Sequence, residues 1–164
     1  MSIGRQVERW LTGEPPGAGQ ATTHERLVAF EADVGSGRAA ARRIGIAEST
    51  WRGWKKGASP RGANREKYQR AERDARAAAT LDLQKIRVDF VQKERKRPDR
   101  ARSLDARQLR IADPAAGQRI RDAYVAGGAA AAGKALIAEI KDPWYAEQLD
   151  LADQDQGDYG FVIG

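Results

Sequence analysis

The sequence contains no cysteine, and it has one histidine and one methionine among 164 residues. Without cysteine, neither disulfides nor thiolate metal sites hold the fold together, and a reducing compartment is compatible with the chain. The single histidine, His24, has no second histidine or cysteine with which to bind a metal, so we assign it no role. No apolar run approaches the roughly 20 residues that a membrane helix needs, and residues 1–10 lack the apolar core of a signal peptide. We expect a cytoplasmic protein with no membrane partner.

Two segments match ligand-binding motifs only in part. Residues 128–134, GAAAAGK, have the Gly and Lys spacing of a phosphate-binding P-loop, but Ala135 stands where the motif needs a hydroxyl for Mg²⁺. A tightly packed, alanine-rich helix is the better explanation. The acidic run over residues 150–158 lacks the glycine and glutamate positions of a calcium loop, which favours a solvated tail. We therefore expect no enzyme activity, metal or cofactor.

The net charge of +6 is distributed unevenly along the chain. Residues 36–107 hold 21 Lys and Arg against 9 Asp and Glu, a balance of +12. The segment before this block carries −2, and the segment after it carries −4. A phosphate-binding region with two acidic flanks is expected to sort its charge in this way. Nucleic acid is therefore the expected partner, and the expected location is the nucleoid.

Residues 37–57, GRAAARRIGIAESTWRGWKKG, have the spacing of a helix-turn-helix. Small residues stand where the two helices would approach each other, and Gly45 tolerates a positive φ in the turn. The residues expected at the approach and in the core are Ala40, Ala41, Ile44, Ile46, Trp51 and Trp54. Because Trp51 and Trp54 are three residues apart, they share one face of the second helix and leave a polar face for the major groove of double-stranded DNA.

The predicted DNA-binding residues of this motif lie on or near that polar face and in the loop that follows. They are Glu48, Ser49, Thr50, Arg52, Lys55, Lys56 and Arg61. Ala47 stands where Ser or Thr usually caps the second helix, so we expect Ser49 to cap it two residues later. The alternative is an ordinary helical hairpin in a basic helical protein.

The predicted fold is mainly α with a small β part, that is, α+β. Residues 3–11 form a short helix, which with its linker occupies residues 1–20. A helix-turn-helix domain over residues 21–80 contains a helix capped by Thr22 or Thr23 that runs to Asp33, then the motif, then a charged helix over residues 65–80. We expect Gly57 to end the second helix of the motif, and Asn64 or Ser59 to cap the charged helix.

Residues 81–164 are predicted to form a β-β-α-α-β module. Alternating apolar residues indicate a strand over residues 85–92 and a second strand over residues 108–113. Two helices follow over residues 114–125 and 129–141, and the sequence WYAEQL adds one helical turn. The acidic tail then leads to a final apolar strand, YGFVIG.

Between the two predicted strands, residues 93–102, KERKRPDRAR, are dense in basic side chains. One interpretation is a solvated hairpin loop. We favour a flexible arm that binds the DNA backbone or the minor groove, where arginine is well suited. The predicted DNA-binding residues here are Lys93, Arg95, Lys96, Arg97, Arg100 and Arg102.

In the order of its parts, the chain resembles a known family over about residues 34–140. The parts are the motif GRAAARRIGIAESTWRGWKKGASPR, the long charged helix, the strand RQLRIADP and the helix pair after it. They look like the terminal proteins of actinobacterial, Streptomyces-type, linear chromosomes and plasmids. The resemblance implies binding to telomeric DNA, covalent linkage of a side-chain hydroxyl to the 5′ end, and priming of end replication with a DNA polymerase and a telomere-associated protein.

The priming role that this resemblance implies requires a hydroxyl group between the basic run and the strand that follows. Ser103 is the only hydroxyl side chain between Leu81 and Ala123. It lies beside Arg100 and Arg102, which could hold a triphosphate, and near Asp99 and Asp105, which could bring Mg²⁺. Ser103 is thus the candidate priming residue.

Two other functions stay open. The first alternative is a helix-turn-helix transcriptional regulator whose C-terminal module dimerises. The second is a small subunit of a phage or plasmid DNA-packaging machine. A homo-oligomer is expected. Covalent nucleotide transfer to Ser103, a palindromic site bound by a dimer, or a ring of many copies would distinguish the three functions.

Overall fold

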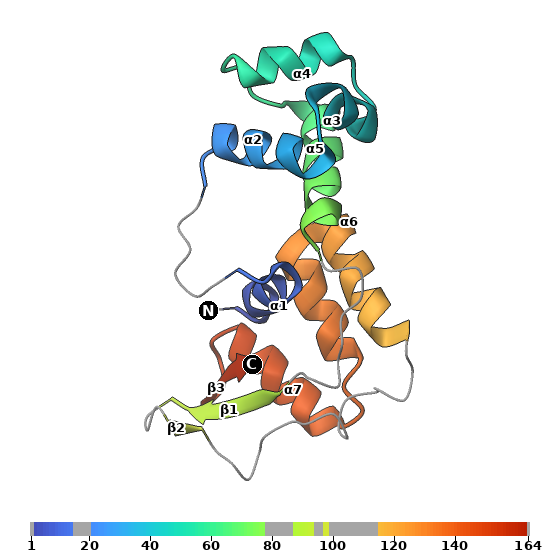
Figure 1. The fold of residues 1–164 in the computed structure, drawn as a ribbon. Helices are drawn as coiled ribbons and strands as arrows, with labels where there is room; N and C mark the ends of the chain where they lie inside the picture. The colour runs from blue at the N-terminus through green and yellow to red at the C-terminus, as the bar shows by residue number, and fades with distance from the viewer. Residues whose placement is uncertain (1, 15–20, 78–86, 94–96, 99–114, 164) are drawn as a thin grey trace. The chain divides into compact units, whose positions relative to one another are not determined.

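The chain folds into two compact units, one central and one made from both ends of the sequence. The computed structural model describes residues 2–14, 21–77, 87–93, 97–98 and 115–163. The central unit spans Pro15–Ala77, and the terminal unit combines Met1–Glu14 with Ala78–Gly164. The described residues are mainly helical with a small antiparallel sheet (Figure 1), so the predicted α+β class is confirmed.

The central unit contains four helices that follow one another closely. They are α2 (Thr23–Val34), α3 (Gly37–Ile44), α4 (Glu48–Lys55) and α5 (Gly62–Arg76). Thr22 caps α2 as predicted, because its hydroxyl accepts from the backbone N–H of Glu25 and the Glu25 carboxylate accepts from the backbone N–H of Thr22. This capping box satisfies two backbone donors that would otherwise be unpaired at the start of the helix.

All four helices contribute to one buried core in the central unit. Its buried residues are Leu27 and Phe30 of α2, Ala40, Ala41 and Ile44 of α3, Trp51 and Trp54 of α4, and Tyr68 of α5. Ile46, also predicted for this core, is half-buried against it. Each large side chain gains about 2 to 3 kcal/mol from burial, which makes the aromatic residues the largest contributors.

The terminal unit begins with α1 (Ile3–Thr12). The sequence predicted a separate N-terminal helix followed by a linker, but this helix belongs to the terminal unit. It packs against α6 (Ala115–Ala138) and against the strand β3 (Tyr159–Ile163) (Figure 1). Ile3, Val7 and Leu11, spaced four residues apart, form the buried stripe of α1. A helix of 10 residues is too short to be stable alone, so α1 depends on this packing.

A glycine contact explains the segment that resembles a P-loop. A Cβ on Gly133 would lie 2.8 Å from the backbone nitrogen of Gly4, and a Cβ on Gly4 would lie 2.1 Å from the carbonyl oxygen of Ala129. The backbones of α1 and α6 therefore touch where both helices lack side chains. The prediction of a tightly packed alanine-rich helix is confirmed, and Lys134 is exposed beside it.

Residues 114–141 were predicted as two helices, and the structure confirms this, because the element labelled α6 consists of two helical segments that meet at a kink. Gly128 within α6 has φ 74° and ψ −161°, which lie outside the helical range. Only glycine adopts this conformation without strain. The helix α7 (Pro143–Asp153) follows and is longer than the single turn expected. Asp142 caps its start, and Pro143 is its first residue.

The sheet has the order β2-β1-β3, with β1 (Val88–Gln92) central and β2 (Arg97–Pro98) short. Val88 and Phe90 are buried, as the predicted alternation requires, and β1 pairs antiparallel with β3 so that Phe90 lies opposite Phe161. The second strand predicted over residues 108–113 lies outside the described residues. The predicted final strand is confirmed as β3.

The acidic side chains of the C-terminal run, Asp150, Asp153, Asp155 and Asp158, are exposed as expected, but the run is not a free tail, because its first part belongs to α7. Asp153 accepts a hydrogen bond of 2.6 Å from the backbone nitrogen of Ile3, which caps α1. The amide of Gln6 donates to the carbonyl oxygen of Phe161 and accepts from the N–H of Ile163, so it pairs with β3 as a neighbouring strand would. Leu149 before the run and Phe161 after it are buried and hold both of its ends against the terminal unit.

No helix in the described part of the chain is long and apolar enough to cross a membrane.

The glycine contact between α1 and α6 gives the first prediction. We expect Gly133→Ala to lower the free energy of unfolding by about 1 to 3 kcal/mol, because a methyl group there meets backbone atoms that cannot turn aside. Chemical denaturation followed by circular dichroism measures the change. Lys134→Ala, at the exposed neighbouring position, is the control and should change stability by less than about 0.5 kcal/mol. Equal stability of the two variants would contradict the close approach.

Candidate nucleic-acid interface

A tight turn after Gly45 joins α3 to α4. Gly45 has φ 78° and ψ 43°, the left-handed conformation predicted for it. Its N–H and that of Ile46 both donate to the carbonyl oxygen of Ala41 at 3.0 Å, which closes the end of α3. Ala40 and Ala41 are buried, as expected for residues that let the helices approach. The turn brings α4 against α2 and α3.

The predicted cap at Ser49 is wrong. The helix α4 begins at Glu48 with Ala47 as its N-cap, and no side chain accepts a hydrogen bond there. The carbonyl of Ala47 still accepts from the N–H groups of Thr50 and Trp51, so the backbone alone starts the helix. The carboxylate of Glu48 lies in the first turn, where the helix dipole favours a negative charge.

The loop after α4 also differs from the predicted caps. Gly57 has φ 110° and follows the end of α4, as expected. The next helix, α5, begins at Gly62 with Arg61 as its N-cap, and no side chain caps it. Asn64 therefore lies inside the first turn, and Ser59 precedes the helix by two loop residues. The N-terminal backbone donors of α5 thus receive no side-chain cap.

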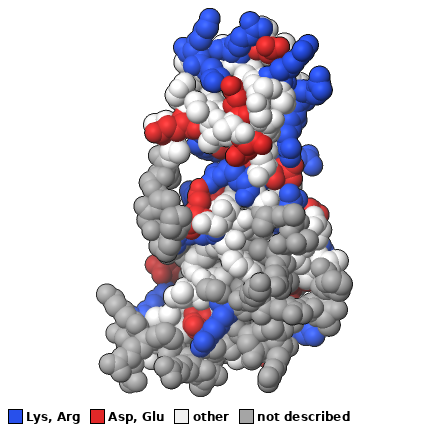
Figure 2. Space-filling model, viewed as in Figure 1, with Lys and Arg blue, Asp and Glu red and all other residues white. Residues whose placement is uncertain are grey.

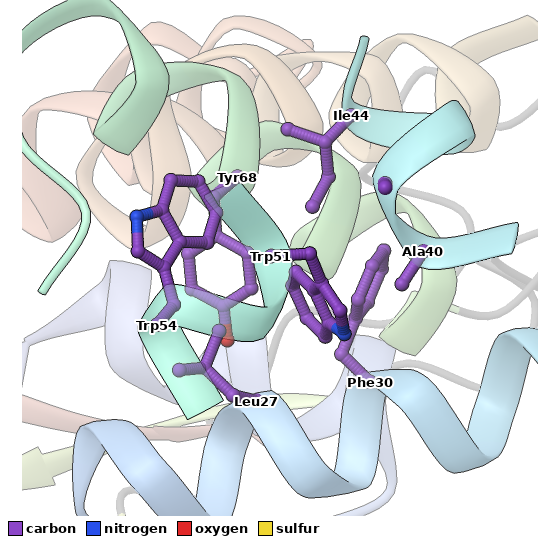
Figure 3. Close-up of a cluster of buried hydrophobic side chains, with 8 residues drawn as sticks. Leu27, Phe30, Ala40, Ile44, Trp51, Trp54 and Tyr68 are labelled. Atoms are coloured by element: carbon purple, nitrogen blue, oxygen red, sulfur yellow. The ribbon is translucent and has the colours of Figure 1, made fainter. Parts of the chain in front are cut away.

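The buried face of α4 is held by rings from three helices (Figure 3). The Trp51 centroid lies 5.9 Å from those of Phe30 and Trp54 and 6.4 Å from that of Tyr68. Tyr68 also meets Phe30 and Trp54 edge to face, at 5.8 and 6.1 Å. Tilted and edge-on rings at these distances attract each other by about 0.5 to 1.5 kcal/mol per pair beyond burial.

One carboxylate of α2 fixes the rotation of α4. The indole N–H of Trp51 donates to Glu31 at 2.7 Å, and the ammonium of Lys55 binds the other oxygen of Glu31 at 3.1 Å. The hydrogen bond from Trp51, followed by that from Lys55, holds the pKa of Glu31 below its ordinary value. Lys55, a predicted DNA-binding residue, therefore faces α2 and is half-buried.

The opposite face of α4 is open. Ser49, Arg52 and Lys56 are exposed, and nothing lies within 4 Å of a Cβ built on Gly53 between them. Among the described residues Arg52 pairs with Glu48 alone, at 3.3 Å on the same helix, and its side chain remains 68% exposed. Such a surface pair contributes little, so Arg52 is free to exchange Glu48 for another acceptor. Thr50 is half-buried at the edge of this face.

Two further acids of the central unit hold arginines of neighbouring helices. Glu72 of α5 is 2% exposed and binds Arg26 of α2 through both oxygens, and Asp74 binds Arg43 of α3 at 2.7 Å. These pairs tie α5 to α2 and to α3. They also pair Arg26 and Arg43, which a count of basic residues in the sequence would include among the cations available to a ligand.

Several basic side chains of the central unit are exposed and have no ion pair with any described residue. They are Arg38 and Arg42 of α3, Lys56 and Arg61 around the loop, and Arg65, Lys67 and Arg70 of α5. Figure 2 shows Lys and Arg side chains gathered over α3 and α4. The sequence-based list omitted Arg38 and Arg42, although their spacing of four residues places them on one face of α3.

Only part of the second predicted DNA-binding segment, residues 93–102, is described. Lys93 binds Asp155 at 2.7 Å, and this interaction holds the pKa of Asp155 below its ordinary value. The backbone of Arg97 and Pro98 forms β2 beside β1, so these residues belong to a hairpin rather than to a free arm. The other predicted residues, Arg95, Lys96, Arg100, Arg102 and the candidate priming residue Ser103, lie outside the described residues.

Acidic and histidine side chains do not converge on an ion site where the structure describes the chain. Within those ranges, no group of three or more His, Asp or Glu side chains is arranged to hold a metal. His24 is exposed in the first turn of α2. The candidate interface therefore consists of cations, hydroxyls and backbone.

Comparison of the chain with protein-family models, with curated proteins and with solved structures gives no match. The residues themselves must therefore support any function assigned to this surface.

Glu31 gives a prediction for the pH dependence of stability. Because its pKa is lower when folded than the ordinary 4.5, Glu31 stabilises the fold above that pH, and the contribution is lost as pH falls through the folded pKa. We expect Glu31→Gln to cost about 1 kcal/mol at neutral pH and much less in acid. Denaturation at neutral pH and at a pH well below 4.5 measures this. An unchanged cost at both pH values would mean that the charge of Glu31 contributes nothing.

Proposed function

We propose that the chain binds double-stranded DNA, with α3 and α4 acting as a helix-turn-helix and α4 entering the major groove. One observation carries the proposal: α4 buries both of its indoles and leaves a single open face with exposed Ser49, Arg52 and Lys56. A helix that enters the major groove needs such a face, free of large apolar residues and able to donate hydrogen bonds.

The charge of the central unit supports the same proposal. Pro15–Ala77 contains 13 Lys and Arg and 7 Asp and Glu, so its net charge of +6 equals that of the whole chain. Three of the acids, Glu31, Glu72 and Asp74, are bound to cations of neighbouring helices. The exposed cations on α3, the loop and α5 are then available for phosphates on either side of a groove.

The face of α4 supplies few long side chains for reading bases. Arg52 is the best candidate for a bidentate contact to guanine, and Lys56 lies one turn later. Gly53 offers only backbone between them. We infer that phosphate contacts supply most of the affinity, and that the basic segment over residues 93–102 adds further backbone contacts.

The resemblance to telomere terminal proteins makes a DNA end of a linear replicon the first site to try. In that role the Ser103 hydroxyl would attack the α-phosphate of the first deoxynucleoside triphosphate, so that a phosphoester bond forms, the bond to pyrophosphate breaks and the hydroxyl proton is lost. A DNA polymerase and a telomere-associated protein would be the partners in this priming step. The alternatives are a dimeric regulator and a ring-forming packaging subunit, both of which would also use the α4 face.

Base reading and phosphate binding can be separated by substitution. We expect Arg52→Ala to reduce discrimination between DNA sites by about 1 to 3 kcal/mol, because a base contact is lost. Replacing Arg38 and Arg42 with Gln should instead weaken binding to all sequences and lower the dependence of log K on log salt by about 2. Fluorescence anisotropy with several duplexes at several salt concentrations measures both.

Lys141→Ala removes one exposed charge from the terminal unit and is the matched control, for which we expect nearly wild-type binding. If none of Arg38, Arg42 and Arg52 affects binding to any duplex, the proposed DNA-binding surface is wrong.

The priming role has its own test. Wild-type protein, a DNA polymerase and labelled deoxynucleotides should give a labelled protein band that resists denaturation, and Ser103→Ala should abolish it. Footprinting on a telomeric end and on random duplex shows whether the end is preferred. DNA binding without adduct formation would leave the regulator or the packaging subunit, which a palindromic site bound by a dimer, or a ring seen by mass photometry, would distinguish.

A further inference from the structure

One acidic side chain lies on the exposed face of α4, among cations and hydroxyls. Glu48 begins the helix with its side chain 44% exposed, and Arg52 follows one turn later. Because residues four apart lie on the same side of a helix, Glu48 and Arg52 share one face. DNA phosphates repel a carboxylate, so Glu48 adds nothing to the affinity for the DNA backbone. Its place on this face calls for a different explanation.

Glu48 and Arg52 form an ion pair that leaves most of their hydrogen-bonding groups free. One N–H of Nη2 of Arg52 donates to Oε1 of Glu48 at 3.3 Å. Among the described residues, neither side chain has another hydrogen bond, so Oε2 of Glu48 and the other guanidinium N–H groups of Arg52 are available. An exposed pair of this kind contributes little to stability, so both groups can exchange each other for a ligand.

The two groups match the two bases of a G·C pair. In the major groove guanine presents two acceptors, O6 and N7, to which a guanidinium donates through two N–H groups. Cytosine presents only the N4 amino group, which donates to a carboxylate. Guanine and thymine would place acceptor oxygens against a carboxylate, and adenine has the N7 acceptor beside its amino group. Cytosine is therefore the base that a carboxylate on this face favours.

The spacing allows both contacts at once. Residues four apart on a helix have Cβ atoms about 5 to 6 Å from each other. Successive base pairs are separated by about 3.4 Å along the duplex. Two long side chains on one face of α4 therefore reach the same base pair or two adjacent ones.

We propose that Glu48 is a specificity-determining residue, whose carboxylate accepts a hydrogen bond from N4 of a cytosine while Arg52 donates to a guanine in the same or the adjacent base pair. This role rests on the proposed DNA-binding function, because it requires α4 in the major groove. The preferred duplex then contains a G·C pair at the position of α4. On other sequences Glu48 faces acceptors and repels them, so it discriminates mainly by weakening binding to the wrong duplex.

The first experiment identifies the preferred duplex and then changes one base pair. Selection from a random duplex pool with the full-length protein gives the preferred sequence. We expect it to contain a G·C pair whose replacement by A·T weakens wild-type binding about tenfold. For Glu48→Ala the two duplexes should bind almost equally, with tighter binding than wild type to the replaced one. Fluorescence anisotropy measures all four dissociation constants.

Modified bases separate the two contacts. N4-Methylcytosine still pairs with guanine but carries a methyl group in place of the N–H that faces the major groove. At one cytosine this change should weaken wild-type binding about tenfold and leave Glu48→Ala unaffected. 7-Deazaguanine lacks the N7 acceptor, and should weaken wild type and Glu48→Ala alike without affecting Arg52→Ala.

Glu48→Gln distinguishes base reading from a purely structural role. Glutamine pairs best with adenine, through N6 and N7, so the selected base should move from cytosine to adenine. A side chain that serves only the helix would not change the selected base. Glu66→Gln removes an exposed charge from α5 of the same unit, and this matched control should select the wild-type sequence.

The failure of this role and the failure of DNA binding are distinguishable. If Glu48→Ala and Glu48→Gln select the wild-type sequence while Arg52→Ala does not, Glu48 reads no base and the DNA-binding proposal stands. Wild-type binding that N4-methylation leaves unchanged at every cytosine would also overturn the role of Glu48 alone. If the full-length protein binds no duplex at all, the DNA-binding proposal is wrong, and the role of Glu48 is wrong with it.

Discussion

The burial of the Trp51 indole is the constraint on which the central unit depends. A buried indole N–H needs an acceptor, and Glu31 of α2 supplies it at 2.7 Å. The ring also needs space at the start of α3, where a Cβ on Gly37 would lie 3.0 Å from Cδ1 of Trp51. One side chain thus fixes α2, α3 and α4 together, and it also determines which face of α4 remains exposed.

This local arrangement could be predicted from the sequence because it follows from spacing. The interval between Trp51 and Trp54 defines one face of a helix, and Gly45 marks a left-handed turn. Cap positions were harder to predict. Ser49 is a good capping residue, but Ala47 lies two residues after Gly45 in extended conformation, with φ −67° and ψ 143°, and its carbonyl already starts the helix. The turn, rather than a capping side chain, sets the beginning of α4.

The terminal unit shows what the sequence could not provide. Helix α1 is visibly amphipathic, but amphipathicity does not identify the partner that covers its apolar stripe. The partner depends on the contact of Gly4 with Gly133 and on the pairing of Gln6 with β3, and both join opposite ends of the chain. The acidic run shows the same limit. Its charged side chains are exposed, as their composition predicts, but its position is fixed by the buried residues Leu149 and Phe161, which lie at its two ends.

The sequence also cannot show which cations remain available after folding. The basic block over residues 36–107 crosses the boundary between the two units, so its basic residues are divided between them. Within the central unit, Glu31 of α2 forms an ion pair with Lys55 of α4, and Asp74 of α5 forms one with Arg43 of α3. Both pairs stabilise contacts between helices. Arg38 and Arg42, which have no such partner among the described residues, remain exposed. Helix packing therefore determines which basic side chains remain exposed, because it pairs some of them with acids of neighbouring helices. A count of basic residues in the sequence includes Lys55, which is paired, and does not show that Arg38 and Arg42 of α3 stay exposed.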